Sequence, residues 1–172
     1  MTHIYIDVRL IRNIGDLSTF EKIMRIMAIR NGNTLIYEDI ASNVGGAART
    51  IKEWVSVLVT SGIIYLLEPY HNKKIERLTH IPKIVFMDRG LACYLAGWTS
   101  AKELQTSKES GRYFETYIVS EIIKQYENKG IQLNISHFRN KQTEEIDLLI
   151  EKNMKIYPIE IKKTSTPKRN IQ

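Results

Sequence analysis

Two neighbouring segments near the carboxy terminus constrain the fold most strongly. Residues 145–150 (EIDLLI) and 157–162 (YPIEIK) mix apolar and polar side chains, as adjacent β-strands do, because successive side chains of a strand point to opposite faces. The intervening residues 151–154 are polar enough to turn the chain. The sequence therefore predicts an antiparallel hairpin whose turn centres on Asn153 and Met154.

This hairpin places two carboxylates against each other. Asp147 is expected directly opposite Glu160, with Cβ atoms roughly 5 Å apart, and Lys162 follows on the same face as Glu160. Facing carboxylates destabilise a sheet unless a shared proton or a bound cation offsets their repulsion. The pattern indicates a site for a hard metal ion beside a water-orienting lysine. The alternative is an exposed hairpin face whose acids pair with Lys155, Lys162 and Lys163.

The composition indicates which kind of partner the protein binds and which cellular compartment it occupies. The chain of 172 residues has a formal charge of +6 and a pI near 9.3, which favours an anionic partner, with nucleic acid, and DNA in particular as the expected partner, ahead of a membrane surface. The alternative is that the excess lysine only aids solubility. A single cysteine, Cys93, excludes an internal disulfide framework and fits a reducing compartment. With no membrane-spanning apolar run and no secretion signal, we expect a cytoplasmic protein.

Two common kinds of site are not indicated by the sequence. The four histidines are scattered without the spacing of metal ligands or of a catalytic triad. No Gly-x-x-x-x-Gly-Lys-Ser/Thr segment is present, so this chain is not expected to bind a nucleotide through a P-loop.

The first half of the chain has the pattern of a winged helix-turn-helix. An extended lead-in over residues 3–9 precedes three helices, which glycines separate, and a β-hairpin is expected after them. The first predicted helix starts at a capping box at Ser18, and the second and third cover 37–43 and 47–60. The predicted strands cover 63–67, 75–78 and 83–87.

Five basic residues are the candidate DNA contacts of this winged helix. Arg49 and Lys52 fall on the polar side of the third helix, where a groove-reading helix carries its cations. Lys73, Lys74 and Arg77 lie on or near the expected wing. Because the basic face is modest, a protein-docking or spacer role for the same unit remains the alternative.

The second half predicts a separate α+β unit. After a short helix at 88–95, the polar residues 99–110 are the candidate linker. A long helix over 112–127 then leads into strands at 132–138, 145–150 and 155–162. We therefore expect a winged-helix domain at 1–98, a linker at 99–110 and a second domain at 111–172.

In this order the segments resemble a known family. The chain is similar to the carboxy-terminal region of unknown function that follows the AAA-type ATPase core in many bacterial and archaeal ATP-binding proteins. The residues that carry the resemblance are Tyr5–Arg9, Trp54 and Val55, Ser61–Ile64, Glu68–Tyr70, Pro82 and Lys83, Phe86–Leu91, Gly111–Glu115, Glu145–Asp147 and Pro158–Lys162.

The resemblance implies a restriction-endonuclease-like PD-(D/E)xK fold for the second domain. It implies that Glu115, Asp147 and Glu160 correspond to the carboxylates that bind Mg²⁺ or Mn²⁺ in such nucleases, and that Lys162 corresponds to the catalytic lysine. The metal would activate a water and neutralise charge on the scissile phosphate. From the residues alone, Glu115 is equally a first-turn acid that favours the helix dipole.

Two classes of function follow from these expectations. The first is a Mg²⁺-dependent DNA phosphodiesterase that works beside an ATPase, and the second is a catalytically silent module that docks DNA or a protein onto that ATPase. The ATPase core is absent from this sequence, so ATP is expected to bind only through an upstream domain. The nuclease-like domain is expected to be incomplete at its carboxy terminus, and oligomerisation is left open.

Overall fold

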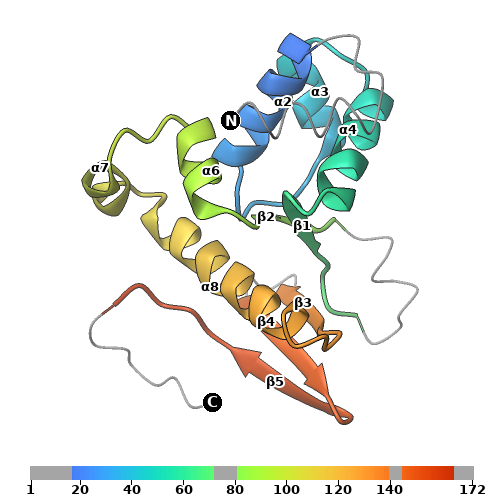
Figure 1. Ribbon diagram of the computed structural model, residues 1–172, viewed down its shortest axis with the longest axis vertical. Helices are drawn as coiled ribbons and strands as arrows, with labels where there is room; N and C mark the ends of the chain where they lie inside the picture. The colour runs from blue at the N-terminus through green and yellow to red at the C-terminus, as the bar shows by residue number, and fades with distance from the viewer. Residues whose placement is uncertain (1–16, 72–80, 140–144, 165–172) are drawn as a thin grey trace.

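The computed structural model describes residues 17–71, 81–139 and 145–164, in which helices combine with small antiparallel sheets (Figure 1). This mixture of helix and sheet confirms the α+β class. The predicted strands at 3–9 and 75–78 lie outside the described residues. The elements follow in the order α2 (Leu17–Ile29), α3 (Tyr37–Val44), α4 (Ala48–Thr60), β1 (Ile64–Leu67), β2 (Lys83–Phe86), α6 (Arg89–Leu95), α7 (Ala101–Thr106), α8 (Ser110–Glu127), β3 (Asn134–Arg139), β4 (Glu145–Lys152) and β5 (Lys155–Ile159).

The helices of the first half form because their apolar residues recur at helical spacing. In α4, Ile51, Val55 and Leu58 lie on one face and are buried in a core shared with α2, α3 and α6. The carboxylate of Asp88 accepts a hydrogen bond of 2.9 Å from the backbone N–H of Leu91 and so caps α6. One detail differs, since Ser18 lies inside α2 and not before its first turn.

Strand β2 is the element on which both halves of the chain pack. All four of its residues are buried, so both of its faces are covered. Ile84 and Phe86 belong to the first core, whereas Val85 joins a second core with residues of α8, β3 and β4. Because side chains alternate along a strand, Lys83 points to the same side as Val85, toward α8 and β4.

Helix α8 is joined to the first half by buried polar contacts. The side-chain amide of Asn31 donates to the hydroxyl of Thr116 at 2.9 Å, and its carbonyl oxygen accepts from the backbone N–H of Phe86 at 3.0 Å. The hydroxyl of Tyr113 donates to the carbonyl of Ala28 at 2.8 Å. These bonds satisfy groups that would be costly to bury alone. Residues 101–106, predicted as part of a linker, form helix α7 beside α8 (Figure 1).

The second sheet has the order β3-β4-β5, and β5 is its edge within the described residues. Pro158 pairs with Leu149, at a position where a two-residue hairpin directs the strand's N–H away from its partner. A proline is tolerated there because the missing donor would face outward, and it discourages a further strand from pairing. The presence of Pro158 is therefore typical of an edge strand.

The turn of the β4–β5 hairpin contains a strained residue. Asn153 and Met154 have φ angles of 52° and 60°, the left-handed conformation that a two-residue turn requires. Asparagine tolerates this conformation, but methionine does not, and the Met154 side chain is fully exposed, so no packing offsets the strain.

Replacing Met154 with glycine is therefore expected to stabilise the protein by about 0.5 to 1 kcal/mol, because glycine adopts a positive φ without steric cost. Urea unfolding measures this change. Met154→Ala is the matched control, since it keeps a Cβ and should not gain. An equal gain in both variants would show that loss of the exposed side chain, and not relief of strain, is responsible.

Candidate functional site

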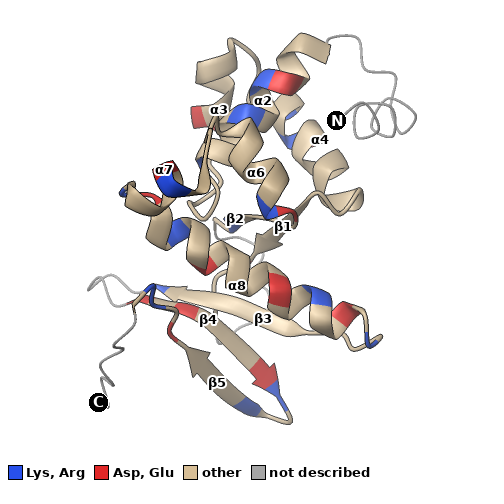
Figure 2. Cartoon of the chain, turned by 60° about the vertical axis from the view of Figure 1, so that its left-hand side comes forward, with Lys and Arg blue, Asp and Glu red and all other residues tan. Residues whose placement is uncertain are grey.

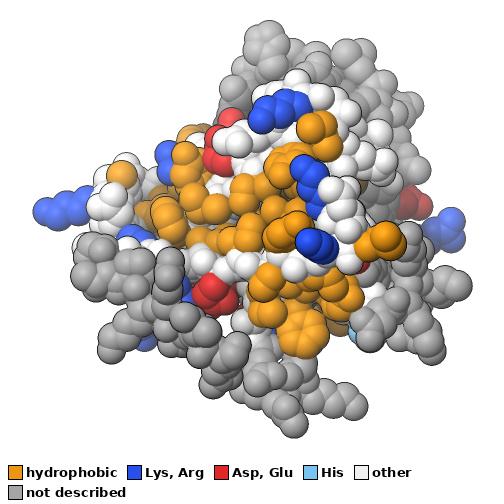
Figure 3. Space-filling model, turned by 90° about the horizontal axis from the view of Figure 1, so that it is seen from below, with side chains coloured by type: hydrophobic (Ala, Val, Ile, Leu, Met, Phe, Trp, Pro, Cys, Tyr) orange, Lys and Arg blue, Asp and Glu red, His pale blue; other side chains and the backbone are white. Residues whose placement is uncertain are grey.

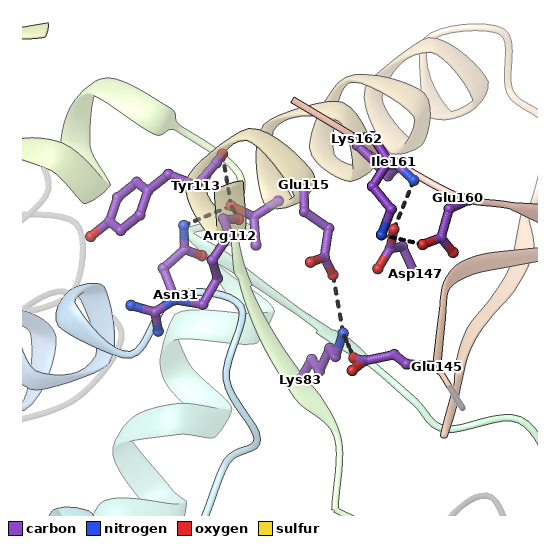
Figure 4. Close-up of polar contacts among 11 residues, drawn as sticks. Asn31, Lys83, Arg112, Tyr113, Glu115, Glu145, Asp147, Glu160, Ile161 and Lys162 are labelled. Atoms are coloured by element: carbon purple, nitrogen blue, oxygen red, sulfur yellow. Dashed lines mark hydrogen bonds and ion pairs between the residues drawn. The ribbon is translucent and has the colours of Figure 1, made fainter. Parts of the chain in front are cut away.

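The predicted carboxylates come from α8, β4 and the residues after β5. The hairpin register pairs Leu148 with Ile159, so its continuation places Asp147 opposite Glu160, as predicted. The backbone N–H of Ile161 donates to Oδ2 of Asp147 at 2.7 Å, which holds this buried carboxylate against the chain leaving β5 (Figure 4). Glu115 extends from the amino-terminal half of α8 toward the same region (Figure 4).

A lysine that the sequence analysis did not single out as a site residue lies beside these acids. The Nζ of Lys83 is 3.0 Å from Oε1 of Glu115 and 2.7 Å from Oε1 of Glu145. The Lys83 side chain is only 8% exposed and that of Glu115 only 18% exposed. The ammonium of β2 thus bridges carboxylates on α8 and β4, and this group is named here the Lys83 cluster (Figure 4).

Burial and charge act in opposite directions on the Lys83 cluster. Burial alone lowers the pKa of Lys83, but the carboxylates of Glu115 and Glu145 outweigh it and leave this pKa above its ordinary value. Burial raises the pKa of Glu115, which Lys83 only partly offsets. Burial also acts to raise the pKa of the more exposed Glu145, but the hydrogen bond and charge of Lys83, together with the charge of Arg139, outweigh burial and lower this pKa. The lysine is therefore held in its charged form by both acids.

The other predicted residues form a second group around Asp147. Lys162 is ion-paired with Glu160, and both side chains are largely exposed, at 62% and 48%. The hydrogen bond between Lys162 and Glu160 is the main cause of a raised pKa for Lys162. Burial raises the pKa of Asp147, the Ile161 N–H opposes that shift, and the charge of Glu160 adds to it. The two carboxylates therefore interact across the hairpin, as expected for facing acids.

The donor atoms of these acids suit a hard cation, because Mg²⁺ and Mn²⁺ prefer carboxylate oxygen. Their arrangement fits a metal less well. Glu115 is engaged by Lys83, Glu160 is engaged by Lys162, and Asp147 accepts a backbone N–H. Among the described residues, no group of three or more His, Cys, Asp or Glu side chains is placed to hold a metal ion. The acids that are close together are balanced by ammonium groups.

His137 is a further buried group that the sequence did not single out. It lies in β3, where its backbone bonds to Glu68 and Tyr70 join the chain after β1 to the second sheet. Neither imidazole nitrogen has a hydrogen-bond partner among the described residues. Burial and the nearby charge of Lys83 lower the pKa of His137 to about 4. The imidazole is therefore neutral at physiological pH.

Of the five predicted DNA contacts, only Arg49 and Lys52 lie among the described residues. Arg49 and Lys52 are exposed on α4, and the Arg49 side chain is 91% exposed despite its contact of 3.5 Å with Glu53. Lys73, Lys74 and Arg77 lie outside the described residues. Elsewhere the charges are mixed, since α8 carries both basic and acidic residues (Figure 2).

Comparison with known families divides the sequence at α7. Residues 2–102 match the family described as domain of unknown function DUF8612, which covers more than half of the chain. The chain belongs to this DUF8612 family. Residues 110–171 match a second domain of unknown function, DUF4143, a domain that commonly follows AAA ATPase domains.

The curated relatives share only low sequence identity with this chain. The chain is 24% identical over 169 residues to the uncharacterized protein Rv2008c of Mycobacterium tuberculosis and to the uncharacterized protein Mb2031c of Mycobacterium bovis. Each alignment covers 95% of this chain but 37% of the relative, so the chain spans little more than a third of the relatives' length. No solved structure matches. Among the described residues, no helix is long and apolar enough to cross a membrane.

Proposed function

We propose that this chain is a DNA-recognition module of a longer AAA-type ATP-binding protein and that it lacks nuclease activity of its own. The observation that carries the proposal is the Lys83 cluster, in which Glu115, one of the expected metal ligands, is already paired with an ammonium group. ATP would be bound by another part of the longer protein, in keeping with the usual place of DUF4143 after ATPase domains.

Several features of the first half support the recognition role. Three helices are followed by an antiparallel β-pair, and Thr34, between α2 and α3, forms a bridge with Lys83 of β2. This arrangement supports a winged helix, in which the third helix, here α4, would enter the major groove. Arg49 and Lys52 on its exposed face would then pair with phosphates. The net charge of +6 favours the same partner.

Fluorescence anisotropy with a labelled duplex tests this proposal. Arg49→Gln and Lys52→Gln should each weaken binding several-fold and reduce the slope of log K against log salt by about 1, because each removes about one phosphate contact. Lys124→Gln is the matched control, since that lysine lies on α8 in a local pair with Glu121. Equal effects of all three substitutions, or none, would contradict binding through α4.

A metal-dependent phosphodiesterase is the second candidate, favoured by the position of Asp147 opposite Glu160 with Lys162 beside them. If Mg²⁺ or Mn²⁺ bound here, Asp147, Glu160 and Glu115 would be its ligands, and it would supply an activated water. The same duplex, incubated with either ion, separates the candidates. The recognition role predicts intact DNA, whereas cleavage that Asp147→Ala abolishes would support the phosphodiesterase.

A further inference from the structure

A cleft with a volume of about 520 Å³ is formed by α6, α7, α8 and Lys163. It belongs to the face of α8 that carries Tyr113, Phe114 and Tyr117, and Glu115 of the Lys83 cluster does not line it. The volume falls in the range of small-molecule sites, about 300 to 1,000 Å³.

Aromatic rings make up much of the wall of this cleft. Tyr94, Trp98, Phe114 and Tyr117 line it, and the Tyr94 side chain is exposed although it is large and apolar in body. Trp98 is held in place by an edge-on contact with Tyr113, with ring centroids 6.2 Å apart and an interplanar angle of 86°. Rings fixed in this way offer flat surfaces on which a planar ligand can stack.

The charges at the cleft have one sign. Of the described residues that line it, Arg89 and Lys163 carry positive charge, and none is a carboxylate. The guanidinium of Arg89 lies 4.4 Å above the centroid of the Tyr117 ring, which keeps a cation beside an aromatic surface. Lys163 is anchored by a hydrogen bond of 2.9 Å from its Nζ to the backbone carbonyl of Gln105.

We propose that this cleft is a binding site for a small aromatic anion. The ring of the ligand stacks on the aromatic wall, and its acidic group pairs with Arg89 and Lys163. Sites that combine a mainly apolar wall with a few placed polar groups obtain affinity from the first and orientation from the second. This site is independent of the DNA-recognition role, because neither Arg49 nor Lys52 lines it.

A pair of fluorescent probes tests the proposal on the intact chain. The probes are 1-anilinonaphthalene-8-sulfonate and N-phenyl-1-naphthylamine, which share an aromatic body but differ in charge. Wild-type protein should bind the sulfonate saturably at one site. Arg89→Gln should weaken sulfonate binding about tenfold, because a charge-assisted contact is lost, and leave the uncharged probe within about twofold. Tyr94→Ser should weaken both probes.

Two control variants keep the result interpretable. Lys102→Gln on α7 removes an exposed charge that does not line the cleft, and it should change neither probe. Hydrophobic side chains are gathered on one face of the molecule (Figure 3). Ile156→Ser removes an exposed apolar side chain from β5 that does not line the cleft. Thermal unfolding confirms that each variant is folded. The proposal is overturned if the sulfonate responds to Ile156→Ser and not to Arg89→Gln, or if Arg89→Gln weakens both probes equally.

Discussion

Replacing Lys83 with methionine is expected to lower the free energy of unfolding by about 3 kcal/mol, because it leaves the buried Glu115 and its neighbour Glu145 without their shared cation. Methionine keeps the length and apolar body of the lysine, so packing is largely retained. Urea unfolding at neutral pH measures the loss.

Lys124→Met is the matched control for this substitution. Lys124 pairs with Glu121 on the exposed surface of α8, where both side chains are about 40% exposed, and its loss should cost less than about 1 kcal/mol. The combined variant Lys83→Met, Glu115→Gln, Glu145→Gln should recover part of the stability, since it removes the uncompensated charges as well. If Lys83→Met and Lys124→Met lost equal stability, the Lys83 cluster would stabilise the fold no more than an exposed ion pair does.

Buried His137 is expected to make the protein less stable in mild acid by about 3 kcal/mol. Its pKa is about 4 in the folded protein against an ordinary value of 6.5, so between these pH values the unfolded chain binds a proton that the folded protein does not. Stability is therefore fully present above pH 6.5 and falls as the pH drops toward 4. Below that pH the imidazole is protonated in both states and adds no further loss.

The effect of His137 is isolated by comparing slopes between variants. Glu115 and Asp147 have raised pKa values, so they bind protons more readily in the folded state and oppose the effect of His137. The unfolding free energy of His137→Leu, measured in urea across this pH range, should fall less on acidification than that of the wild type. Parallel curves for the two proteins would contradict a neutral, buried His137.

The β4–β5 hairpin could be predicted from the local sequence pattern alone. Alternating side chains and the polar turn at Asn153 determine the register, and that register in turn sets Asp147 opposite Glu160. Helices α4 and α8 could also be predicted from the sequence, because their apolar residues recur at helical spacing over several turns. Helix α7 was missed because six mainly polar residues carry no such period, although Ser100 caps the helix through the N–H of Glu103.

The candidate site was harder to predict because its partners are distant in sequence. Lys83 and Glu115 are 32 residues apart, and they meet only because β2 is buried between two cores. A lysine followed by Ile84, Val85 and Phe86 could have signalled a buried cation, since a charged residue opening a fully apolar strand needs a partner. His137 carried no comparable signal, because its burial depends on the pairing of β3 with the chain after β1.

A calorimetric titration with Mn²⁺ tests most directly whether lysines, and not a metal ion, balance the acids of this chain. Our account predicts no saturable binding tighter than about 1 mM in the wild-type protein, and the same weak heats for Glu160→Gln and Asp147→Ala. Binding at one site with micromolar affinity, lost in either variant, would contradict it and favour the phosphodiesterase.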